Sequence, residues 1–275
     1  LFRSDDDGSS LKGIKKNKGA FFNPYNGLIY FSLALILLYY LGSYWQGQDL
    51  FRGLIKTQLI IIALPVLLII RLLKMKPNQV LRLQAPKLLP ALLIPIMAIP
   101  ATMLVAILSQ VINTIWPFPK EYLENLGKLF IQDVPLWQSF LVISVAPGVC
   151  EELLFRGLFP RFFEKYGTKI TILLTALLFA AFHLDPFRFV PVFLLGLLLG
   201  YITLKSGSIY LSMLSHAINN GLAFFFTAFA AEPWIKVLIS DADNLHYWVA
   251  APALAVFLLA LYLFNKACGA KECVE

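Results

Sequence analysis

The sequence predicts an all-α fold, that of a polytopic helical membrane protein with about eight transmembrane helices. Of its 275 residues, 59% are hydrophobic and only 14% are charged, whereas about a quarter of the residues in a soluble domain carry a charge. Several apolar runs also reach the roughly 20 residues that a helix needs to cross about 30 Å of hydrocarbon. These features argue against a soluble globular protein.

Eight apolar segments are the candidate spans. The third is unusually long and carries Pro90, Pro95 and Pro100. Because proline removes a helical hydrogen bond, we expect this span to be kinked or partly broken. The expected spans are residues 27–42, 57–73, 88–116, 136–158, 169–185, 187–204, 208–231 and 246–264.

The basic residues predict an orientation in the membrane. If the N-terminus lies in the cytoplasm, the inner segments hold 17 lysines and arginines and the outer segments hold six. Cytoplasmic loops carry such an excess in membrane proteins. We therefore expect cytosolic N- and C-termini and a multi-pass protein of the cell (plasma) membrane. The same layout accounts for the net charge of +7 without a nucleic-acid partner.

Three regions follow from these spans. Residues 1–26 form a flexible polar cytosolic lead-in without the apolar stretch of a signal peptide. Residues 27–264 form the membrane domain, and 265–275 a short cytosolic tail. Apolar residues within 117–135 have the spacing of a short helix, lying either on the membrane surface or in a packed outer loop.

The stretch "VCEELLFRGLF" places charged side chains inside the fourth span. Glu151, Glu152 and Arg156 each cost roughly 2.5 kcal/mol or more at a helix centre, so contact with lipid does not explain them. Glu152 and Arg156 are four residues apart with the acid first, which favours an ion pair on one helix face. Glu151 is rotated by about 100° from Glu152, which leaves it freer to act on water.

A turn after the fourth span predicts a second feature of the site. Gly167 is a natural C-cap and Thr168 a natural N-cap. Glu151 lies 16 residues before Gly167, and His183 lies 16 residues after it. In an antiparallel helix pair both positions lie about 24 Å from the turn, although Pro160 bends the first arm. A carboxylate and an imidazole could therefore face each other inside the membrane.

Further polar side chains follow the helical repeat. His216 and Asn220 are four residues apart and could donate hydrogen bonds to one point. Asn219 could replace Asn220, although its offset from His216 fits less well. Phe179 and His183 have the same spacing of four, so Phe179 could shield the site.

Several of these residues also fit structural roles. Each histidine alone would fit a hydrogen bond between helices, but the combined set on three helices favours a catalytic site. Cys150 and Ser215 are interpreted as packing residues, and Gly196 and Gly200 as sites of close helix contact.

Three motifs resemble those of a known family. "EELLFR" is similar to the EExxxR motif of the CAAX protease and bacteriocin-processing (CPBP, or Abi) intramembrane proteases, "FAAFH" to their FxxxH motif and "HAINN" to their HxxxN motif. They occur in the family's order, and the resemblance covers about residues 136–231. It extends to the type II CAAX prenyl endopeptidases.

The resemblance implies an intramembrane protease with a helical core and a catalytic cavity open toward the cytosol. It implies that Glu151 and His183 bind and activate a water. His216 and Asn220 would stabilise the oxyanion, and Glu152 and Arg156 would support the site. A buried glutamate suits a general base, and amide and imidazole donors suit an oxyanion.

The residues leave the role of a metal open. Glu151, His183 and His216 could in principle form a zinc triad with one free position, and the family has been called metallopeptidase (metalloendopeptidase). No HExxH motif is present, and the three residues come from separate helices. The sequence therefore favours a glutamate mechanism without a cofactor over a zinc mechanism.

The expected partners are membrane lipid and a protein or peptide substrate, with prenylated proteins, secreted peptides and bacteriocins as the candidate classes. Two other functions are compatible with a membrane-embedded carboxylate–histidine pair. One is a non-proteolytic membrane scaffold, and the other is a proton-coupled transporter. The sequence leaves the oligomeric state open.

Overall fold

The computed structural model of the protein is helical, as the sequence predicts. It describes residues 21–123, 127, 134–230, 232–233, 235–238 and 245–269. Within these ranges, eight helical runs are joined by loops and short turns, which confirms the expected fold class. Residues 1–20 of the expected lead-in and 270–275 of the expected tail lie outside the described residues, as does much of the helix expected within 117–135.

The first two runs form a helical hairpin. Asp49 caps the start of the second arm, where its Oδ1 accepts a hydrogen bond from the backbone N–H of Arg52 at 2.8 Å. A Cβ on Gly53 would lie 2.5 Å from the backbone of Gln46, so glycine lets the two arms meet. The arms are α2 (Pro24–Leu37), η1 (Leu38–Gly42) and α3 (Ser43–Gln48), followed by α4 (Leu50–Lys56), η2 (Thr57–Ala63) and α5 (Leu64–Leu72).

The other six runs complete the fold. The third is continuous, with Pro95 and Pro100 inside one helix, so the expected partial break is not found. The fourth and fifth runs meet at Gly167, which has a positive φ of 84°. Gly167 is also the N-cap of the fifth run, in place of the expected Thr168. The runs are α7 (Leu88–Ile115); α9 (Leu136–Phe140), η3 (Leu141–Val145), α10 (Ala146–Glu152), η4 (Leu153–Leu158), α11 (Phe159–Phe163) and η5 (Glu164–Tyr166); α12 (Thr168–Phe182); α13 (Phe189–Ser206); α14 (Ile209–Ala228); and η7 (Tyr247–Val249) with α15 (Ala250–Cys268).

Three wide π-helical segments precede prolines. The segments η2, η3 and η4 end two residues before Pro65, Pro147 and Pro160 respectively. Proline has no N–H for the carbonyl four residues earlier, and its ring crowds that carbonyl. A wider turn relieves the crowding. The last two prolines thus leave the carbonyls of Ile143 and Arg156 without their usual helical donor.

Side chains from distant segments bond to these two carbonyls. The amide Nδ2 of Asn220 on α14 donates to the carbonyl of Ile143 at 3.3 Å. Nη1 of Arg82, from the loop before α7, donates to the carbonyl of Arg156 at 3.1 Å. Buried carbonyl groups require such partners. The prolines of the fourth run therefore create acceptors that hold helix α14 and the loop before α7 in place.

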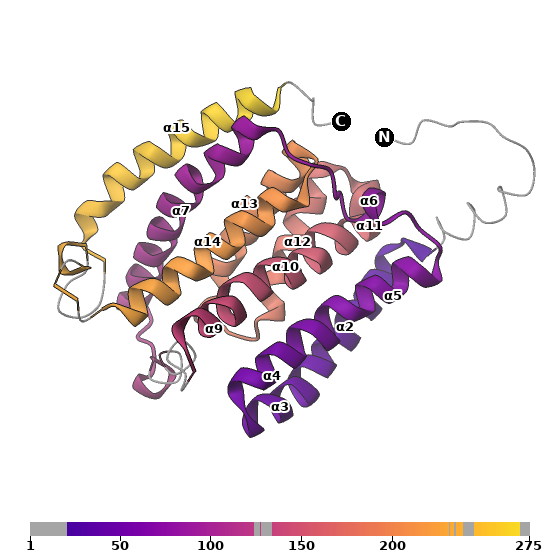
Figure 1. Ribbon diagram of the computed structural model, residues 1–275, viewed down its shortest axis with the longest axis horizontal. Coiled ribbons are helices and arrows are strands. Elements are labelled where there is room, and N and C mark those ends of the chain that lie inside the picture. The colour runs from indigo at the N-terminus through magenta and orange to yellow at the C-terminus, as the bar shows by residue number, and fades with distance from the viewer. Residues whose placement is uncertain are drawn as a thin grey trace, which may run out of the picture.

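Helix α10 occupies the centre of the bundle. Figure 1 shows the α2–α5 hairpin along one side, α7 and α15 along the other, and α9–α14 between them. Helix α10 packs against both α14 and η2, and α14 packs against α7. The main apolar core surrounds the fourth run, where Leu154, Phe155, Leu158 and Phe159 are fully buried. The charged residues of that run therefore lie in the interior.

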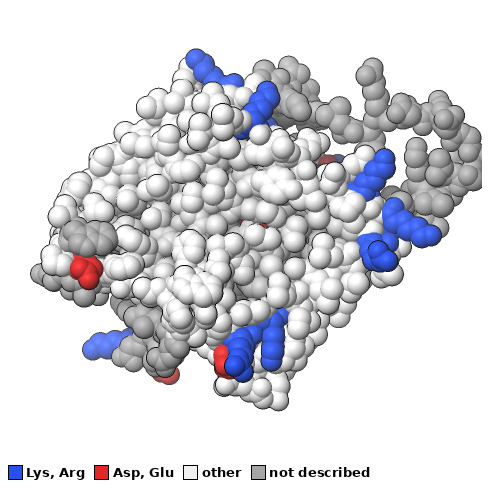
Figure 2. Space-filling model, viewed as in Figure 1, with Lys and Arg blue, Asp and Glu red and all other residues white. Residues whose placement is uncertain are grey.

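The described surface has the charge pattern of a membrane protein. Figure 2 shows almost all charged side chains at two opposite ends of the visible face, with a broad uncharged band between them. Among the described residues, five helices are long and apolar enough to cross a membrane, and Thr168–Phe182 is a shorter apolar helix. The five are Pro24–Gln48, Leu50–Leu72, Leu88–Ile115, Phe189–Ser206 and Tyr247–Cys268.

An acidic residue organises the loop between α12 and α13. Oδ1 of Asp185 accepts from the backbone N–H groups of Phe187 and Arg188, and its Oδ2 accepts from Arg188 Nε at 2.6 Å and from the Tyr122 hydroxyl at 2.8 Å. Burial alone would raise the pKa of Asp185. Arg188 and these hydrogen bonds outweigh it and hold that pKa below its ordinary value of 3.8.

We expect Asp185→Asn to destabilise the protein by about 1–3 kcal/mol at pH 7, because hydrogen bonds to the charged carboxylate are lost. A lowered folded-state pKa stabilises above the ordinary pKa, and this contribution disappears as pH falls through the lowered value. The difference from wild type should therefore shrink below about pH 3.8. Thermal unfolding in detergent at pH 7 and below pH 3.8 tests this. Tyr122→Phe, which removes one hydrogen bond to Asp185, is the control and should have a smaller effect. Equal stabilities at pH 7 would contradict it.

Candidate active site

An ion pair lies at the centre of the fourth run. Nη1 of Arg156 is 2.8 Å from Oε1 of Glu152, and the two residues are 2% and 0% exposed. Nη2 of Arg156 donates to the backbone carbonyl of Gly196 on α13 at 3.1 Å. The same-face ion pair predicted from the spacing is confirmed, and it also ties the fourth run to α13.

Phe179 of α12 lies at the centre of the predicted residues. The guanidinium carbon of Arg156 is 4.3 Å from its ring centroid, a favourable cation–π contact. The rings of His183 and His216 lie edge-on to Phe179 at centroid distances of 4.8 Å and 5.6 Å. A Cβ on Gly196 would lie 3.2 Å from this ring, so glycine allows α13 to approach. One phenyl ring therefore brings together residues of three helices.

His216 lies between the two adjacent glutamates. Its Nδ1 is 2.9 Å from Oε1 of Glu152, and its Nε2 is 4.0 Å from Oε2 of Glu151. Glu152 is paired with Arg156 and is a hydrogen-bond acceptor, so Nδ1 of His216 carries a hydrogen and donates to it. This leaves Nε2 directed at Glu151. The ring is thus oriented by one glutamate toward the other.

Glu151 contacts a residue that the sequence analysis did not identify. Nε2 of Gln58, in η2, donates to Oε1 of Glu151 at 2.8 Å. Glu151 and Gln58 are 8% and 6% exposed. Oε2 of Glu151 is buried without a hydrogen-bond partner among the described residues. A glutamine within an apolar span is the signal that could have indicated Gln58, since polar side chains there usually face other helices.

His183 caps the end of α12. Its Nδ1 is 2.8 Å from the carbonyl of Phe179, and a carbonyl accepts, so Nδ1 carries the hydrogen and Nε2 is the acceptor. His183 is close enough to Glu151 and His216 to interact with both electrostatically. Within the described residues, however, no hydrogen bond joins it to Glu151. The predicted pair therefore lie within electrostatic range of each other, without a hydrogen bond or ion pair between them in the described structure.

Asn220 belongs to a chain of hydrogen bonds behind the site. One of its amide N–H groups bonds the carbonyl of Ile143, and its Oδ1 accepts from Nδ2 of Asn219 at 3.1 Å. Oδ1 of Asn219 accepts from the hydroxyl of Thr102 on α7 at 3.2 Å. An amide group has two N–H donors, so the Ile143 bond leaves Asn220 a second one. Asn219 supports Asn220 instead of replacing it.

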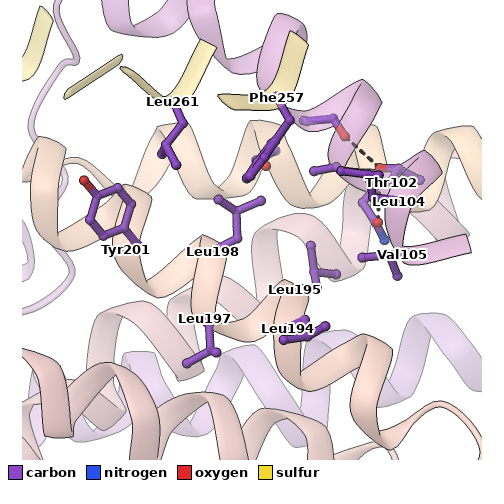
Figure 3. A pocket seen from close by; sticks show the side chains of 14 residues that line it. Thr102, Leu104, Val105, Leu194, Leu195, Leu197, Leu198, Tyr201, Phe257 and Leu261 are labelled. Atoms are coloured by element: carbon purple, nitrogen blue, oxygen red, sulfur yellow. Dashed lines mark hydrogen bonds between the residues drawn. The ribbon is translucent and has the colours of Figure 1, made fainter. Parts of the chain in front are cut away.

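An apolar cavity of about 430 Å³ lies on the other side of α14, between that helix and α7, α13 and α15 (Figure 3). Leucines of α13, with Phe257 and Leu261 of α15, form part of its wall. Ser215 and Asn219 also line it, whereas Glu151 and His216 do not. The cavity is therefore separate from the charged residues. Helix α14 directs Ser215 and Asn219 toward the cavity and His216 toward the glutamates.

The arrangement does not fit a zinc triad. Within the part of the chain that the structure describes, no three histidine, cysteine or carboxylate side chains are grouped closely enough to hold a metal ion. Nε2 of His216 and Oε2 of Glu151 lie 4.0 Å apart, whereas Nδ1 of His183 is bonded to the carbonyl of Phe179 and His183 makes no ion pair with Glu151 among the described residues. We therefore derive no catalytic step through a metal.

Comparison with known protein families finds one match. Residues 133–222 match the family model described as type II CAAX prenyl endopeptidase Rce1-like. These residues are similar to an Rce1-like domain. The resemblance seen in the three motifs is thereby confirmed for this part of the chain. No curated protein and no solved structure matches the chain.

The Rce1-like domain contains the two glutamates, Arg156, both interior histidines and Asn220. It begins just before α9 and ends within α14. Gln58 and Thr102 lie outside it, on helices that precede it in the chain. The polar interior is therefore assembled from the Rce1-like domain and from two helices that the family match does not cover.

Proposed function

We propose that the protein is an intramembrane endopeptidase that hydrolyses a peptide bond with a water activated by Glu151. The observation that carries this proposal is the pair formed by Oε2 of Glu151 and Nε2 of His216, 4.0 Å apart in the interior of the Rce1-like domain. This separation is too long for a direct hydrogen bond. One water at about 2.8 Å from each atom would satisfy both.

Glu151 is the general base in the proposed reaction. It takes a proton from the water, and the hydroxide attacks the carbonyl carbon of the substrate to give a tetrahedral intermediate. When the carbon–nitrogen bond breaks, Glu151 returns the proton to the leaving nitrogen. The hydrogen bond from Gln58 occupies Oε1, so Oε2 is the oxygen available for this transfer.

The histidines and Asn220 orient the water and the oxyanion. Nε2 of His183 is the ring nitrogen without a hydrogen, and the side chain lies within electrostatic range of Glu151. It therefore suits the role of acceptor for the second O–H of the water, while Oε2 of Glu151 accepts the first. The second N–H of Asn220 is the proposed donor to the oxyanion, together with His216 when Nε2 is protonated. Glu152 and Arg156 hold His216 in place and take no part in bond breaking.

The proposed substrate is a prenylated protein with a CAAX-type C-terminus, and the site is proposed to open toward the cytosol, the side on which the sequence predicts both chain termini. The family description supports the substrate, and the distribution of lysine and arginine supports the orientation. Buried hydrocarbon contributes about 0.8 kcal/mol per methylene, so the prenyl group should increase affinity strongly.

The test uses purified protein in liposomes and two peptides that differ only in farnesylation of the CAAX cysteine. We expect the farnesylated peptide to be cleaved with at least tenfold higher kcat/KM, and we expect a chelator to leave the rate unchanged. Equal cleavage of both peptides would contradict the CAAX assignment. Loss of activity with chelator and recovery with zinc would contradict the metal-free mechanism. Absence of any cleavage would favour a scaffold or transporter.

A further inference from the structure

We propose that Gln58 is a positioning residue for Glu151, which holds the carboxylate in its reactive orientation both before and after Glu151 takes a proton. This inference rests on the proposed role of Glu151 as the general base. It concerns a residue outside the Rce1-like domain match at 133–222, on the second arm of the N-terminal hairpin. The site would then need that hairpin for activity.

The geometry gives Gln58 control over the glutamate side chain. Segment η2 packs directly against α10, and the Gln58 amide reaches Oε1 of Glu151 at 2.8 Å. A carboxylate held at one oxygen has its second oxygen fixed in direction. That second oxygen, Oε2, is the one that faces Nε2 of His216 at 4.0 Å. The contact with Gln58 therefore sets where the base points.

An amide suits both protonation states of a general base. Its NH₂ group donates to a carboxylate, whereas its carbonyl oxygen accepts from a protonated carboxyl group. Oε1 of Gln58 is buried without a hydrogen-bond partner among the described residues. Rotation of the amide by half a turn would direct that oxygen at Glu151 after proton transfer. A hydrocarbon side chain of the same length could hold neither state.

The other charged and titratable groups around Glu151 come from elements other than η2, the segment that carries Gln58. Among the described residues they are Cys150 and Glu152 on the same helix, Arg156 in η4, His183 at the end of α12 and His216 on α14. None of these lies on η2. Gln58 thus provides the hydrogen bond from the N-terminal hairpin to Glu151, and its replacement leaves these other groups in place.

Thr57 provides a matched control. It is the preceding residue of η2, is 3% exposed, and its Oγ1 accepts a hydrogen bond from Gln46 Nε2 at 3.2 Å. This bond joins the two arms of the hairpin and does not touch Glu151. Thr57→Val therefore removes one buried hydrogen bond from the same helical segment without changing the contact to the base.

The test compares Gln58→Leu, Gln58→Met and Thr57→Val with the wild type in liposomes, using a farnesylated CAAX peptide. We expect both Gln58 variants to lower kcat about tenfold or more with KM changed less than twofold. The acidic limb of the kcat/KM profile should move to higher pH, because the hydrogen bond to the charged carboxylate is the stronger of the two that are lost. Thr57→Val should keep the wild-type kcat and profile.

A second readout needs no substrate. Infrared titration of the carboxyl band that disappears in Glu151→Gln should have a midpoint at higher pH in both Gln58 variants than in Thr57→Val. Unchanged kcat, profile and midpoint in folded Gln58 variants would overturn the inference and reduce Gln58 to a packing residue. Wild-type cleavage by Glu151→Gln would instead overturn the proposed function, so the two failures are distinguishable.

Discussion

Replacing Glu151 with glutamine is expected to lower the turnover number by about 10³-fold, within the range of roughly 10²–10⁴ that a general base contributes. Glutamine has nearly the same shape and can still contact Gln58 and His216, but it cannot take a proton from water. The loss should appear in kcat, with little change in KM or in the unfolding temperature. Steady-state cleavage of the farnesylated peptide by purified protein measures kcat and KM. Thermal unfolding of the same protein measures the unfolding temperature.

A matched control is Glu121→Gln, because Glu121 is an exposed glutamate in the described part of the chain and is not one of the proposed site residues. It makes the same chemical change without removing the proposed base, so wild-type turnover is expected. A Glu151→Gln protein that cleaves as fast as Glu121→Gln would rule out Glu151 as the base.

Replacing Arg156 with methionine is expected to destabilise the protein by about 3–5 kcal/mol, because it leaves a buried carboxylate without its partner. Glu152 is 0% exposed and has Arg156 and His216 as its hydrogen-bond partners. The substitution also removes the bond to the carbonyl of Gly196. Thermal or denaturant unfolding in detergent measures the change.

The double variant Glu152→Met with Arg156→Met provides the control for this interpretation. If the cost of Arg156→Met comes from an unpaired buried charge, removing both partners should cost less than the two single substitutions added together. Additive effects would show that the two side chains act independently, and would contradict a structural ion pair.

The local features of this protein could be predicted from the sequence. Apolar runs of the right length identified the helices, and four-residue spacing identified the pair of Glu152 and Arg156, because both signals depend on neighbouring residues of one helix. The turn at Gly167 was placed correctly for the same reason, although the cap itself fell one residue away from the expected Thr168.

Contacts between distant segments could not be predicted in this way. Gln58 and Glu151 are 93 residues apart, and no helical period relates them. The pairing of His216 with Glu152 depends on how α14 packs against α10, which the motif alone does not show. The continuity of α7 through Pro95 and Pro100 likewise depends on neighbouring helices, which override the local preference of proline.

The two adjacent glutamates therefore have different environments. Glu152 is tied to an arginine and a histidine, whereas Glu151 keeps one oxygen without a protein partner in the described structure. The most direct measurement compares Glu151→Gln and Glu152→Gln for turnover and unfolding temperature in the same preparation. We predict that Glu151→Gln loses turnover while retaining the unfolding temperature, and that Glu152→Gln unfolds at a lower temperature. Wild-type turnover in a folded Glu151→Gln protein would contradict the account.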